Sequence, residues 1–78
     1  MTPRAWLIAA GEALYGPRWQ SDLALDLGRT YRTVLRWVDG TTPVPADIPE
    51  QIGRLLRARR TRIAALERAA VDLPHAAA

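Results

Sequence analysis

Two arginines four positions apart, Arg32 and Arg36, are the side chains of this sequence best suited to recognising another molecule. At helical spacing they share one face. A guanidinium group can donate two hydrogen bonds to the major-groove edge of guanine, or pair with a phosphate alone. On the same segment, Tyr31 could meet a phosphate or a thymine methyl group. Thr33 could meet a base or a phosphate, or only complete its own helical turn.

The element that carries these arginines is predicted to be a short helix, Tyr31–Val38. Thr30 is suited to cap its first turn, because a threonine hydroxyl can accept a hydrogen bond from a free main-chain amide. Val34 and Trp37 form its apolar inner face, which leaves the arginines on the outside. The pair Asp39-Gly40 is expected to end the helix.

A second short helix, Gln20–Leu27, precedes it with only three residues between the two. Leu23 and Leu27 place apolar side chains on the inner face. Gly28 provides the left-handed backbone that ends the helix. So short a turn makes the two helices cross steeply, and Ala24 provides the small side chain that such a crossing needs. This spacing predicts a helix-turn-helix from Gln20 to Asp39.

Two further helices flank this pair. The first begins at Thr2-Pro3 and stops at Gly16-Pro17, with an apolar face of Trp6, Ala9, Ala10, Ala13 and Leu14. After a proline-rich loop, the last begins near Asp47 and runs to about Asp72. The predicted fold is therefore all-α: one compact four-helix domain over residues 1–73, with a long C-terminal helix and a frayed tail at 74–78.

The stretch Gln20–Gly40 resembles the Cro- and repressor-type helix-turn-helix family, also called the Xre family. It covers about a quarter of the chain. The flanking residues 13–20 and 43–45 look like those of small phage and prophage members. The resemblance implies that the second helix of the motif lies in the major groove of DNA, where Tyr31, Arg32, Thr33 and Arg36 would contact bases. One departure is Arg29, where the family usually has a buried aliphatic residue.

The same resemblance implies phosphate contacts around this helix. Gln20, at the start of the preceding helix, is the best placed, helped by the amides of the helix N-terminus. The other expected phosphate contacts are Arg18, Arg29, Thr30 and Thr41.

A seven-residue repeat in the last helix predicts a homodimer. Its two columns form an apolar seam, and the expected dimer contacts are Ile63, Leu66, Ala70 and Leu73. Arg59 interrupts the seam, so a long coiled coil is not expected. The alternative is a last helix that bends back over its own domain. A two-fold dimer would read a palindromic operator with half-sites one DNA turn apart, ~34 Å, or a multiple of it.

All eleven basic residues are arginine, and the net charge of +3 suits a polyanionic partner. The arginines between residues 54 and 62 are better explained as a solvated surface than as a site, although RNA or flanking DNA could use them. We expect no enzyme and no cofactor. The chain has no cysteine, its single histidine is His75, and it shows no nucleophile arrangement and no phosphate-binding glycine loop.

No apolar run approaches the ~20 residues of a membrane span, and no export signal is recognised. We therefore expect a cytoplasmic protein with no membrane partner. Because no ligand pocket is evident, we also expect no small-molecule effector. The leading hypothesis is a dimeric transcriptional repressor, regulating itself, that binds double-stranded DNA. The alternative is a protein-interaction module, such as a phage-encoded inhibitor or an antitoxin.

Overall fold

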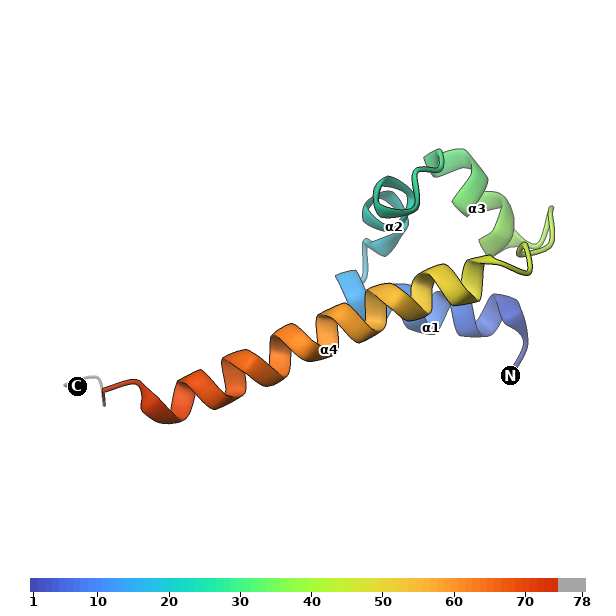
Figure 1. Ribbon diagram of the computed structural model, residues 1–78. Coiled ribbons are helices and arrows are strands. Elements are labelled where there is room, and N and C mark those ends of the chain that lie inside the picture. Colours follow the sequence, from blue (N-terminus) through green and yellow to red (C-terminus); the bar gives the residue numbers. More distant parts are fainter. Residues whose placement is uncertain (75–78) are drawn as a thin grey trace.

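The computed structural model describes residues 1–74, which form four α-helices and no strand. The helices are α1 (Pro3–Tyr15), α2 (Trp19–Leu27), α3 (Tyr31–Asp39) and α4 (Ile48–Asp72), shown in Figure 1. The predicted all-α fold with four helices and a long last helix is confirmed. Residues 75–78, with His75 and most of the predicted tail, lie outside the described residues.

The helix boundaries follow from the residues predicted to set them. The Thr2 hydroxyl accepts a hydrogen bond from the Ala5 amide at 3.1 Å, which caps α1. Gly28 adopts the left-handed conformation with φ of 67°, and the Arg29 amide then donates to the Ala24 carbonyl at 2.9 Å. Arg29 therefore does not disturb the turn: its side chain is exposed and its main chain closes α2.

The core lies where α1 meets the other three helices. Its buried members are Leu7, Ala10, Leu14, Trp19, Leu23, Ala24, Val34, Trp37, Ile48 and Ile52. The predicted apolar face of α1 is partly wrong, because Ala9 and Ala13 are exposed whereas Leu7 is fully buried. Alanine contributes little area to burial, so the larger leucines decide which side of α1 turns inward.

The last helix extends well beyond this core (Figure 1). The molecule measures 53 × 24 × 23 Å. Its radius of gyration is 15.9 Å, against about 11.5 Å expected for a compact chain of this length. Ile48 and Ile52 are completely buried, whereas Ile63 is 49% exposed and Leu66 is 59% exposed. The alternative in which α4 folds back over its own domain is therefore not what the structure has.

No helix within residues 1–74 combines the length and the apolar character that crossing a bilayer requires.

Candidate nucleic-acid interface

The helix α3 presents its two arginines to solvent. Val34 is fully buried and Trp37 is 3% exposed, and both join the core that contains Ile48 and Ile52 of α4. Arg32 and Arg36 lie on the opposite side of α3 and are exposed. The outer face of α3 therefore points away from α4, and it carries two free guanidinium groups four residues apart.

The first turn of α3 is held by two threonines. The Thr33 amide donates to the Thr30 hydroxyl at 3.2 Å, and the two hydroxyl oxygens lie 2.9 Å apart. Thr33 is half-buried, off the face that carries the arginines. The two hydroxyls thus hydrogen-bond to each other, and the Thr30 hydroxyl caps the helix. For Thr33 this matches the predicted role of completing its own helical turn. Thr30 itself remains exposed.

Two other side chains border the arginines. Tyr31 opens α3 and is 50% exposed, so its ring is available beside Arg32. Leu35 lies between the arginines in sequence and is half-buried. The surface beside the guanidinium groups is consequently part aromatic and part aliphatic, which suits contact with base edges and thymine methyl groups.

The far end of α3 is tied to the first helix. The Arg4 guanidinium donates through Nε to the Val38 carbonyl at 2.6 Å, across 34 residues of sequence. Gly40 takes a left-handed φ of 82°, and the Asp39 carboxylate accepts a hydrogen bond from the Thr41 amide at 2.8 Å. Hydrogen bonds from Thr41 lower the pKa of Asp39, and the charges of Arg4 and Arg36 lower it further. Both ends of α3 are therefore anchored.

The residues expected to meet phosphates lie at the start of α2 and in the turns on either side of α3, and they differ in how exposed they are. Gln20 is half-buried in the first turn of α2, and that helix end has no side-chain cap: its N-cap residue, Arg18, makes no such hydrogen bond. Arg29 and Thr41 are exposed in the turns that precede and follow α3. The uncapped amides of α2 and the Arg18 side chain thus share one end of that helix, where a phosphate is favoured.

No family model, no curated protein and no solved structure matches this chain.

A network that the sequence analysis did not predict joins α1, α2 and α4. The Tyr15 hydroxyl donates to the Asp26 carboxylate at 2.5 Å. Burial raises the pKa of Tyr15 far above its ordinary value, and the bond to Asp26 raises it further. Arg59 lies over the Tyr15 ring at 5.6 Å and donates to the Leu14 carbonyl at 2.5 Å. Arg59 is therefore an anchor for the end of α1, at the position where it was predicted only to interrupt a seam.

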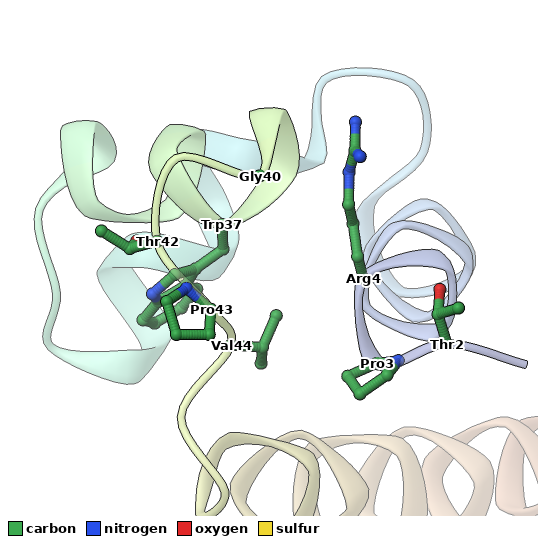
Figure 2. A pocket seen from close by; sticks show the side chains of 8 residues that line it. All are labelled: Thr2, Pro3, Arg4, Trp37, Gly40, Thr42, Pro43 and Val44. Carbon is green, nitrogen blue, oxygen red and sulfur yellow. The ribbon is translucent and has the colours of Figure 1, made fainter.

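A small cleft separates the start of α1 from the loop that follows α3. Figure 2 shows Arg4 on one side of it and Trp37, Pro43 and Val44 on the other. Its volume of about 250 Å³ lies below the usual range of small-molecule sites. Apart from the Arg4 guanidinium, which already binds Val38, the walls are mostly apolar.

The arginines of α4 lie away from the exposed face of α3. Arg54 pairs with Glu50 at 2.9 Å on the surface, whereas Arg57, Arg60 and Arg62 are exposed. The predicted dimer residues Ile63, Leu66 and Ala70 are exposed along the same helix. Leu73 is also exposed, but it caps the helix with an extended backbone rather than continuing it.

Proposed function

We propose that this protein is a cytoplasmic, sequence-specific DNA-binding regulator that inserts α3 into the major groove. The observation that carries the proposal is the pair of exposed arginines, Arg32 and Arg36, on a nine-residue helix whose opposite side is buried. A single exposed helix face with two guanidinium groups fits the width of the groove. Contacts of Arg32 and Arg36 with guanine would specify sequence, with Tyr31 and Thr33 at the margin.

Phosphate contacts would set the register of α3 on the duplex. The exposed residues Arg29, Thr30 and Thr41 lie in the turns on either side of α3, and the exposed Arg18 and the half-buried Gln20 lie at the start of α2. A backbone phosphate would sit against the uncapped first turn of α2. This arrangement separates the two tasks: α3 reads bases, and its flanks hold the sugar-phosphate backbone.

The proposed mechanism is repression by a homodimer. Two copies joined through Ile63, Leu66 and Ala70, with Leu73 at the margin, would bind an inverted repeat. When that repeat overlaps a promoter, the bound dimer excludes polymerase. An operator in front of the protein's own gene would make the regulation autogenous, and occupancy would then follow protein concentration.

The test is a titration of variants on an operator obtained by random-site selection. Arg36→Ala should weaken binding by about 1–3 kcal/mol and relax the preference at one base pair. The matched control is Arg57→Ala, which removes the same charge from an exposed position on α4. If both variants lose equal affinity and keep the same sequence preference, only net charge matters and Arg36 does not read a base.

A second candidate function, a protein-interaction module, is favoured by the apolar residues on the rear of α4. Leu66 is 59% exposed, whereas Leu35 and Val38 on α3 are half-buried and offer little contact area. Under this hypothesis Arg36→Ala leaves function intact and Leu66→Glu abolishes it. Random-site selection that enriches no sequence would favour this alternative.

A further inference from the structure

The apolar stripe of α4 continues past the domain that covers its first half. Ile52, Leu56 and Arg59 follow one another at three- and four-residue spacing, and Ile63 and Leu66 continue the same series. These positions therefore share one side of the helix. The front of the stripe is buried or half-buried, and the rear is exposed.

Helix α1 covers the front of this stripe, and α1 ends at the level of Arg59. The Arg59 guanidinium reaches the Leu14 carbonyl at 2.5 Å and lies over Tyr15, the last residue of α1. One turn later Ile63 is already 49% exposed. Figure 1 shows α1 lying along the first half of α4, with the second half bare. Any helix that covers Ile63 and Leu66 must therefore lie in line with α1, on the same side of α4.

This placement excludes a parallel pair of α4 helices in register. Ile52 lies about 16 Å along the helix from Ile63. At the usual crossing of ~20°, two paired helices have separated sideways by only about 6 Å over that length. A helix with its side chains is about 10 Å across. The partner's α4 would therefore occupy the space that α1 fills, and the partner's own α1 would add to the overlap.

We infer that α4 pairs with α4 of a second copy in the antiparallel direction, with Ile63 facing the partner's Leu66. This inference rests on the homodimer of the proposed function and gives it a direction. In this register Arg60 lies beside the partner's Glu67, so that two opposite-charge pairs flank the seam. Arg59 then faces the partner's Ala70, the smallest side chain on the stripe, so the bond of Arg59 to α1 need not break.

The register also fits the available length. The partner's α4 ends at Asp72, which would lie about two residues, ~3 Å, beyond the level of Arg59 toward the end of α1. Two helix C-termini would meet there, and each carries a partial negative charge. The Arg59 guanidinium already lies at that junction, so the residue that interrupts the apolar seam provides the charge that the junction needs.

The antiparallel direction determines how far apart the two recognition helices lie. The centre of the pair, between Ile63 and Leu66, is about 25 Å from the start of α4. Figure 1 shows α3 above the first turns of α4. Two copies therefore place their α3 helices about 50 Å apart or more along the pair, too far for half-sites one turn, ~34 Å, apart. Half-sites two turns apart are expected.

The experiment uses the absence of cysteine from the chain, so that each introduced cysteine is the only one. Arg60→Cys and Glu67→Cys proteins, one carrying a tag of different mass, are mixed and treated with a short bis-maleimide. The expected product is the mixed dimer, with little product from either protein alone. Ala70→Cys under mild oxidation should stay monomeric, because the two introduced thiols would be about 16 Å apart. Arg57→Cys, on the opposite side of α4, is the matched control.

Efficient disulfide formation by Ala70→Cys alone would show a parallel pair and overturn the inference, while leaving the homodimer in place. A monomer at every concentration in sedimentation would overturn both the homodimer and its direction. DNA recognition by α3 is measured separately, by titrating a single half-site with the wild type and with Arg36→Ala. If the wild type and Arg36→Ala bind the half-site with equal affinity, the proposed function is refuted, whatever the cross-linking shows.

Discussion

Replacing Gly11 by alanine tests the close approach of α1 to the Trp19 ring of α2. A Cβ atom at Gly11 would lie 2.2 Å from Cε3 and 2.4 Å from Cδ2 of the Trp19 ring. Trp19 is only 2% exposed, so the ring cannot move aside freely. Overpacking of this kind costs about 1–3 kcal/mol. Alanine recovers about 0.5–1 kcal/mol in a helix relative to glycine.

The net expectation is a loss of about 1–2 kcal/mol of folding free energy. For a domain of this size, that corresponds to a fall in Tm of about 5–15 °C. Gly53→Ala is the matched control, because a Cβ atom there meets nothing closer than the flexible end of Arg57 at 3.8 Å. Gly53→Ala should therefore raise Tm by a few degrees.

Thermal unfolding followed by far-ultraviolet circular dichroism measures both variants. Because Trp19 opens α2, Gly11→Ala should also weaken the proposed DNA binding, whereas Gly53→Ala should leave it unchanged. If Gly11→Ala melts at or above the wild-type temperature, then α1 and α2 do not approach one another as described, and the position of α2 beside α3 must be reconsidered.

Two further predictions concern the network between α1 and α4. Arg59→Ala removes a hydrogen bond from a charged donor and a contact with an aromatic ring, so unfolding by urea should show a loss of about 1–3 kcal/mol. Arg57→Ala, at an exposed position on the opposite side of α4, should stay within about 0.5 kcal/mol of wild type; equal losses in the two variants would contradict the anchoring role of Arg59. Tyr15 is held neutral in the fold by burial and by its bond to Asp26, so its pKa is raised. The contribution of Tyr15 to the free energy of unfolding should therefore be fully present below pH ~10, the ordinary tyrosine pKa. It should be lost as the pH rises above that value. Tyr15→Phe should remove that part of the alkaline loss, and an unchanged pH profile in the variant would count against the Tyr15–Asp26 bond.

The helix-turn-helix could be predicted from sequence because its determinants are local. Gly28 and Thr30 end one helix and begin the next through their own conformation and hydroxyl group. Val34 and Trp37 identify the buried side of α3 by spacing alone, and both are buried in the structure. The exposure of Arg32 and Arg36 follows from the same spacing. Their contact with bases remains a prediction.

The anchors could not be predicted because their partners are distant in sequence. Arg4 binds the Val38 carbonyl across 34 residues, and Arg59 binds the Leu14 carbonyl across 45. No local pattern distinguishes these two arginines from those that remain in solvent. The buried side of α1 was also misjudged for a long-range reason. Trp19 packs against Gly11, and this contact turns Leu7 inward together with Leu14, whereas Ala9 and Ala13 face solvent.

Arg4 binds a carbonyl at the end of α3, and Arg59 binds one at the end of α1. The choice of arginine at these two places limits which chemical changes can break the bonds. A guanidinium group is not deprotonated in proteins, and the acetylation that neutralises lysine does not act on arginine. The two bonds that close α1 and α3 are therefore insensitive to lysine-directed modification.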